Sequence, residues 1–184
     1  YTVDKLDNDD IQLKNLLEYD AVVLGIRAFN TNEQLKFANK ELFAYVKNGG
    51  NVIVQYNTSH RLVTEEIAPY EIKLSRDRVT VEQAEIRILE ENHPLITGPN
   101  KISEKDFEGW VQERGLYFPN SWGKEFVPIL SSNDPGEEPL DGGLLVAKHG
   151  KGYFVYTGYS WFRQLPAGVP GAYKIFANMI SLGK

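Results

Sequence analysis

The chain has 184 residues, 42% of them hydrophobic, and its 25 acidic and 20 basic side chains give a formal net charge of −5. This composition is typical of one globular domain with a two- or three-layer core, and it excludes a disordered chain and a collagen-like repeat. The acidic balance, without any stripe of Lys or Arg, argues against nucleic acid and membrane surfaces as partners, because both need clustered positive charge.

The chain contains no cysteine, which excludes thiol nucleophiles, thiolate zinc sites, iron–sulfur clusters and disulfides. No apolar run approaches the ~20 residues that span a bilayer. A cysteine-free chain suits either side of a membrane, and we slightly favour a periplasmic or secreted location. Because the sequence opens on Tyr1 and not on Met, we expect a piece of a longer polypeptide.

The first sixty residues alternate between helix and strand signals. A capping pattern at Asp9 predicts a first helix, and the apolar run 21–24 predicts a buried strand. A second helix is predicted from Thr31 until Gly49 ends it, and 52–54 follows as the next strand. Strands alternating with helices predict a parallel sheet with crossover helices.

The rest of the chain is less regular. Residues 85–89 alternate like a strand, whereas 94–126 have no sustained period and are interpreted as long ordered loops with short elements. Residues 144–156 predict an antiparallel edge hairpin, and an amphipathic helix follows Pro170. We therefore predict a single domain over 1–184, a three-layer α/β fold whose sheet is mostly parallel.

Residues 158–162, Gly-Tyr-Ser-Trp-Phe, come closest to a nucleophile elbow. The last position of the G-x-S-x-G pattern is Phe162, whereas an elbow needs a small residue there. The chain then continues through Pro166 and Pro170, whereas an elbow is followed by a helix. A structural turn is the favoured interpretation.

No metal or cofactor is expected. The three histidines are far apart in the sequence, and the acidic stretch 133–141 lacks the register of a calcium loop, so we interpret it as a solvated surface loop. Gly49-Gly50 precedes a strand, whereas a phosphate loop follows one.

One set of aromatic and planar polar residues is suited to sugar rings, with packing in the core and loops as the alternative. The set is Trp110, Gln112, Glu113, Arg114, Tyr117, Trp122, Trp161, Arg163 and Gln164.

Several segments of the sequence resemble known families. Residues 19–25, 45–54, 92–96 and 150–158 resemble the class I glutamine-amidotransferase-like superfamily, and ThuA-like proteins in particular. Residues 27–30, 111–118 and 133–139 resemble the C-terminal region of large bacterial PIG-L/LmbE-type deacetylases. The resemblance implies a flavodoxin-like sheet, a carbohydrate ligand, and a partner in an N-terminal zinc de-N-acetylase domain of the same polypeptide.

This chain lacks the catalytic groups of both families. The strand end that should carry the amidotransferase cysteine reads Gln55-Tyr56-Asn57, and His93-Pro94 supplies only half of the deacetylase zinc motif. The resemblance therefore implies an accessory domain with no catalytic residue of its own.

Two functions stay open. The first is a non-catalytic binding or assembly domain, with Arg27, Asn57, Arg114, Trp161 and Arg163 predicted to contact a ligand at the strand ends. The alternative is a hydrolase of a sugar-like substrate that uses the polar cluster Arg27, Asn57, Glu113, Arg114 and Arg163.

The resembling proteins usually have a further strand and helix before the segment that matches 1–6. We therefore expect residues 2–6 to form an edge strand, through which two copies can join as a homodimer.

Overall fold

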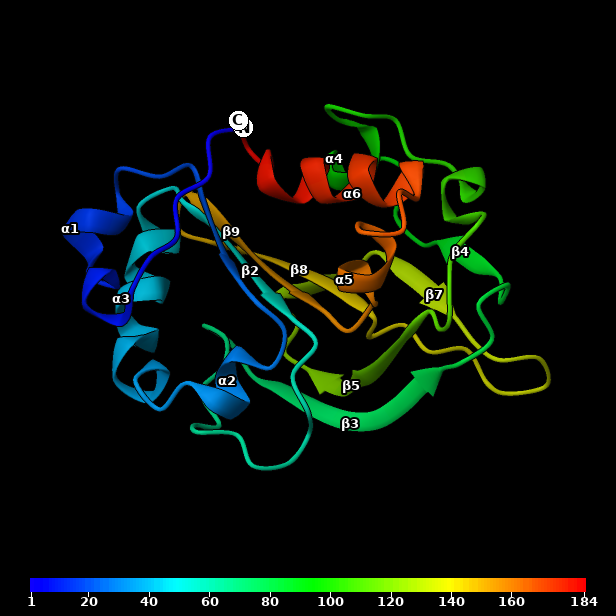
Figure 1. The fold of residues 1–184 in the computed structure, drawn as a ribbon, viewed down its shortest axis with the longest axis horizontal. Helices are drawn as coiled ribbons and strands as arrows, with labels where there is room; N and C mark the ends of the chain where they lie inside the picture. Colours follow the sequence, from blue (N-terminus) through cyan, green and yellow to red (C-terminus); the bar gives the residue numbers. More distant parts are fainter.

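A computed structural model describes residues 1–184 and folds them into three layers around a five-stranded sheet (Figure 1). The strand order is β1-β2-β9-β8-β6. Three strands run parallel to one another: β1 (Ala21–Leu24), β2 (Asn51–Gln55) and β9 (Gly152–Thr157). The strand β8 (Leu144–His149) is antiparallel to β9, and β6 (Phe126–Pro128) is antiparallel to β8. This confirms the predicted flavodoxin-like three-layer fold and the antiparallel hairpin β8–β9, but the hairpin is not at the sheet edge, because β9 is the central strand and β6 lies outside β8.

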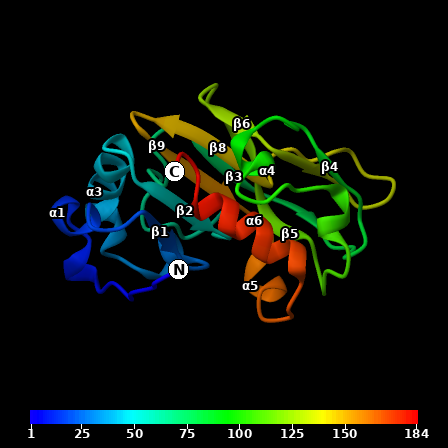
Figure 2. The same cartoon turned by 90° about the horizontal axis from the view of Figure 1, so that it is seen from above.

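Helices cover both faces of the sheet, as the crossover connections require. On one face α3 (Leu35–Lys47) packs with α1 (Leu13–Leu16), and on the other α6 (Pro170–Ile180) packs with α4 (Pro94–Thr97); Figure 2 shows α6 lying across the strands. The side chains of β2 alternate between these layers. Val52 and Val54 belong to the core under α3, and Ile53 to the core under α6.

The remaining elements are two further strand pairs and several short helices, and they lie mostly around one end of the sheet. Two-stranded antiparallel pairs are formed by β3 (Ile72–Val79) with β5 (Gly115–Trp122) and by β4 (Ile86–Ile88) with β7 (Leu130–Ser132). The short helices are α2 (Ala28–Thr31), α5 (Trp161–Gln164) and the 3₁₀ turns Asn8–Asp10 and Glu104–Phe107. None of the helices has the length and apolar character needed to span a membrane.

The interpretation of 94–126 as loops with short elements holds for its first two thirds but misses β5, because Gly115–Trp122 is an eight-residue strand. Its partner β3 makes three register shifts between Lys73 and Arg78, so strict alternation is lost in both strands. Pairing between distant segments, and not a local pattern, defines this strand.

Three predicted N-terminal features are also wrong. Residues 2–6 form no strand; the Tyr1 hydroxyl lies 3.1 Å from Ser181 Oγ at the end of α6, and β1 is itself the sheet edge. The capping box lies at Asp7, whose backbone N–H donates to the Asp10 carboxylate, and not at Asp9. Thr31 lies inside α2, and α3 begins at Leu35.

The acidic stretch 133–141 is exposed at its tip but not at its base. Asp134 is buried, and its carboxylate accepts hydrogen bonds of 2.7–3.0 Å from the backbone N–H groups of Thr80 and Val81 and from the Thr80 hydroxyl. Burial by itself would raise the Asp134 pKa, but these donors and the charge of Arg78 outweigh it and lower the pKa. The interpretation as a solvated loop is therefore wrong for Asp134.

A tight approach between the turn before β2 and the start of β9 depends on glycine. A Cβ atom on Gly152 would collide with the carbonyl oxygens of Gly50 and Val46, whereas a Cβ on Gly25 would have no neighbour within 4 Å. We predict that Gly152→Ala lowers the free energy of unfolding by about 1–3 kcal/mol or more, because backbone atoms must move. Urea denaturation measures this loss. Gly25→Ala is the control and should change stability by less than about 0.5 kcal/mol; equal losses in both variants would contradict the prediction.

Candidate functional site

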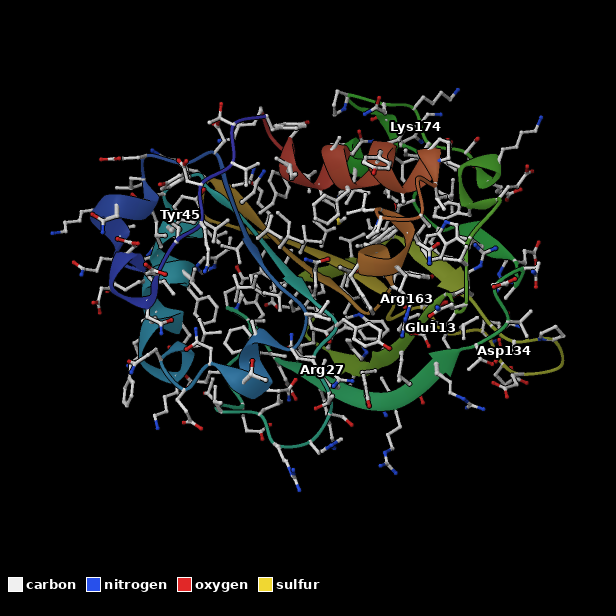
Figure 3. The ribbon with its side chains drawn as sticks, viewed as in Figure 1. Arg27, Tyr45, Glu113, Asp134, Arg163 and Lys174 are labelled. Carbon is white, nitrogen blue, oxygen red and sulfur yellow. The ribbon has the colours of Figure 1, made fainter.

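The carboxyl ends of the three parallel strands bring polar side chains to one edge of the sheet, where open α/β sheets bind ligands. Arg27 follows β1, Tyr56 follows β2 and Ser160 follows β9, and the segment leading into β5 brings Glu113 to them. We call Tyr56, Glu113, Ser160 and Arg163 the strand-end cluster (Figure 3 labels Glu113, Arg163 and Arg27).

One carboxylate oxygen is the centre of this cluster. Glu113 Oε1 accepts hydrogen bonds from the Tyr56 hydroxyl at 2.8 Å and from the Ser160 hydroxyl at 2.9 Å. The Arg163 Nε atom lies 3.5 Å from the same oxygen, which is an ion pair but not a hydrogen bond. All three contacts fall on Oε1, so Oε2 is left to accept from a ligand; the Glu113 side chain is 19% exposed.

The Tyr56 phenol is a donor and not a nucleophile. Burial raises its pKa far above 10, and the hydrogen bond to Glu113 raises it further, while Arg163 opposes the shift. The phenol is therefore protonated at neutral pH. The Ser160 hydroxyl is buried and donates to the same carboxylate, so neither hydroxyl has a base that would take its proton in the way a histidine does.

Aromatic rings surround the cluster. The Tyr56 ring lies edge-on to Phe162, with centroids 4.9 Å apart, and to Tyr117, at 5.8 Å. The ring centroids of His60 and Tyr117 are 6.5 Å apart, and the Arg163 guanidinium carbon lies 4.9 Å from the ring centroid of Phe162. Tyr56 is buried beneath these rings, whereas Tyr117 and Phe162 are half-buried and His60 is exposed. They offer apolar surface beside the carboxylate.

Backbone strain is concentrated at this edge. Five residues other than glycine have positive φ: Arg27, Tyr56, Arg61, Gln112 and Tyr117. Arg27 donates its backbone N–H to the Tyr56 carbonyl, Gln112 precedes Glu113, and Arg61 follows His60. Such conformations cost about 1 kcal/mol or more each and tend to collect at functional sites, so their clustering supports a site here.

The structure brings two of the five predicted binding residues, Arg27 and Arg163, to the surface at this edge. The other three are buried. Asn57 accepts from the backbone N–H of Phe29 at 2.9 Å and donates to the Gln55 carbonyl, so it holds α2 against the end of β2. Its contact with a ligand stays a prediction.

Arg114 and Trp161 lie behind the cluster. The Arg114 guanidinium donates to the carbonyl oxygens of Ala84 and Phe107, and burial lowers its pKa to about 10, which leaves it charged at neutral pH. Trp161 donates its indole N–H to Thr157 Oγ1 at 2.8 Å. The Ser160 backbone N–H donates to the Arg114 carbonyl at 2.8 Å, so these residues position Ser160.

The turn at Ser160 differs from the sequence interpretation in one respect, because the helix α5 does follow it. The φ of Ser160 is −82°, which lacks the left-handed strain of a nucleophile elbow; Tyr56, at the end of β2, has that strain instead, with φ of 45°. Sequence reasoning missed Tyr56 as a site residue, although its place at the strand end could have signalled it. No group of three or more acidic or histidine side chains is arranged to hold a metal ion.

Comparison with known proteins shows the fold. No family model and no curated protein matches the chain. Among solved structures, a cytoplasmic protein of Salmonella typhimurium LT2 is similar over 100% of this chain and 82% of its own length, with 15% identity and a TM-score of 0.64. A putative ThuA-like protein of Bacteroides uniformis is similar over 98% and 77%, with 14% identity and a TM-score of 0.56. The chain therefore has a ThuA-like fold.

We predict that the two hydroxyls on Glu113 Oε1 are energetically coupled. Tyr56→Phe and Ser160→Ala should each lower the free energy of unfolding by roughly 1–3 kcal/mol, because each removes a hydrogen bond to a charged group. The double variant should lose more than the sum, since the partly buried carboxylate then keeps neither donor. Urea denaturation of the four proteins measures the coupling, and additivity within about 0.3 kcal/mol would contradict it.

Proposed function

We propose that the strand-end cluster binds a carbohydrate without transforming it, and that the domain is an accessory part of a PIG-L/LmbE-type zinc de-N-acetylase in the same polypeptide. The ThuA-like fold and the sequence phrases that resemble those deacetylases support the second half of this proposal. The contacts at Glu113 support the first half.

The observation that carries the proposal is the fixed carboxylate beside aromatic faces. Two hydroxyl donors hold Glu113 Oε1, which leaves Oε2 free to accept from a ligand donor. The half-buried rings of Tyr117 and Phe162 lie against the ring of Tyr56, whose hydroxyl donates to this carboxylate. A sugar presents both complementary surfaces, with hydroxyls that donate to a carboxylate and an apolar C–H face that packs on a ring.

The same contacts favour binding over catalysis. The place of an amidotransferase nucleophile is occupied by Tyr56, whose raised pKa keeps it protonated. The Ser160 hydroxyl faces a carboxylate with no histidine between them, so an alkoxide is not stabilised there.

A sugar hydrolase is the second candidate, and the contact between Glu113 and Ser160 is the observation that favours it, because a carboxylate can act as a general base. Release of nitrophenol from nitrophenyl glycosides by the purified chain, lost in Glu113→Gln, would support the hydrolase and contradict a purely binding role.

We predict that Glu113→Gln weakens sugar binding by about tenfold or more, since a charged acceptor is lost. Isothermal titration calorimetry with N-acetylglucosamine and with glucose measures the dissociation constants. The matched control is Glu138→Gln, which removes the same charge from an exposed loop and should bind like the unmodified protein.

Circular dichroism of each variant confirms folding before titration. Binding that is unchanged in Glu113→Gln would place the ligand elsewhere. The absence of binding to any sugar in a panel of N-acetylated and simple monosaccharides would contradict the carbohydrate proposal as a whole.

A further inference from the structure

We propose that the sugar bound at the strand-end cluster carries an anionic group, a carboxylate or a phosphate, that pairs with Arg163 and Arg27. This inference rests on the proposed carbohydrate function and specifies the ligand class of that site.

The first step is the unfilled hydrogen-bonding capacity of Arg163. Its Nε atom is buried and has no hydrogen-bond partner. The nearest carboxylate oxygen, Glu113 Oε1, lies 3.5 Å away and already accepts two hydroxyl hydrogen bonds. The side chain is 37% exposed, and its Nη atoms make no hydrogen bond within the chain. A guanidinium with free parallel donors is the group that best matches a carboxylate or phosphate.

The second step is the position of Arg27. Its backbone is held in the left-handed region, with φ of 57°, and its N–H donates to the Tyr56 carbonyl at 3.2 Å, which fixes it beside the cluster. Its side chain is exposed and takes part in none of the ion pairs of the chain. Figure 3 shows Arg27 and Arg163 on the same side of the molecule as Glu113.

The third step is the local charge. Arg27, Arg61 and Arg163 lie along this edge, where the carboxylates of Glu113 and of Glu82, which accepts from the Gln112 backbone N–H, are fewer than the arginines, although the whole chain has a net charge of −5. A positive edge on an acidic protein attracts anions and repels cations, and it does so over a range set by the ionic strength. A neutral sugar would offer no charge to Arg27, which is in no ion pair, and would leave Arg163 with only its 3.5 Å ion pair to Glu113.

The test compares three ligands that share one ring. Glucose, glucuronate and glucose 6-phosphate are titrated calorimetrically into the full chain at low salt. We expect at least one anionic sugar to bind about tenfold or more tightly than glucose, since a charge-assisted hydrogen bond is gained. Which of the two binds more tightly distinguishes a carboxylate from a phosphate ligand. The preference should decrease as sodium chloride is added.

Variants assign the preference to residues. Arg163→Gln and Arg27→Gln should each reduce the ratio of glucose to anionic-sugar dissociation constants by several-fold, with a smaller effect on glucose itself. Lys151→Gln is the matched control, because Lys151 is exposed in the turn before β9, at the opposite end of that strand, and loses the same charge. Its ratio should not change. Arg27→Gln alters an exposed side chain, so it remains informative if Arg163→Gln does not fold.

The outcomes separate this inference from the proposed function. If glucose binds as tightly as both anionic sugars, the inference is overturned and the carbohydrate function stands. If no sugar binds, both fail. A preference for anions that persists unchanged in both arginine variants would overturn the assignment to Arg163 and Arg27.

Discussion

The parallel register of β1, β2 and β9 is the constraint on which the site depends. Val54 pairs with Leu24 on one side and with Tyr156 on the other, so the three strands end at the same level. Tyr56 and Ser160 leave their strands there and reach a single oxygen of Glu113. A shift of one residue would turn each side chain to the opposite face of the sheet, and the two hydroxyls would no longer meet.

Much of the central sheet could be predicted from the sequence because its signals are local. The run Val52-Ile53-Val54 is continuously apolar since both faces of the strand are buried under helices, and the strand proved to lie between β1 and β9. The hairpin β8–β9 was predicted from two apolar runs around a glycine turn. Of the candidate site, the structure places Arg27 and Arg163 beyond the carboxyl ends of β1 and β9, where the sequence predicts them, and their contact with a ligand stays a prediction.

What sequence reasoning missed depends on contacts between distant segments. The pairing of β3 with β5 is interrupted by bulges, so neither strand shows a period of two. The strand β5 begins two residues after Glu113, so this pairing helps to position that carboxylate. Asp134 is buried because Thr80 and Val81, more than fifty positions earlier in the chain, supply its hydrogen bonds. Arg114 and Trp161 have the residue types of a binding site, yet hydrogen bonds to Ala84 and Thr157 use their polar groups inside the core.

The five left-handed residues around the strand-end cluster have a consequence for how this protein would respond to selection. At the three that are exposed, Arg27, Arg61 and Gln112, glycine would relieve the backbone without opening a cavity, so the native side chains are kept although they cost about 1 kcal/mol per position. Selection for thermostability alone should therefore enrich glycine at Arg27, Arg61 and Gln112, and would remove the Arg27 side chain from the site. A library sorted for stability would recover glycine at these positions, and the same library sorted for ligand capture would recover the native residues. This difference is the signature of a trade-off between stability and activity.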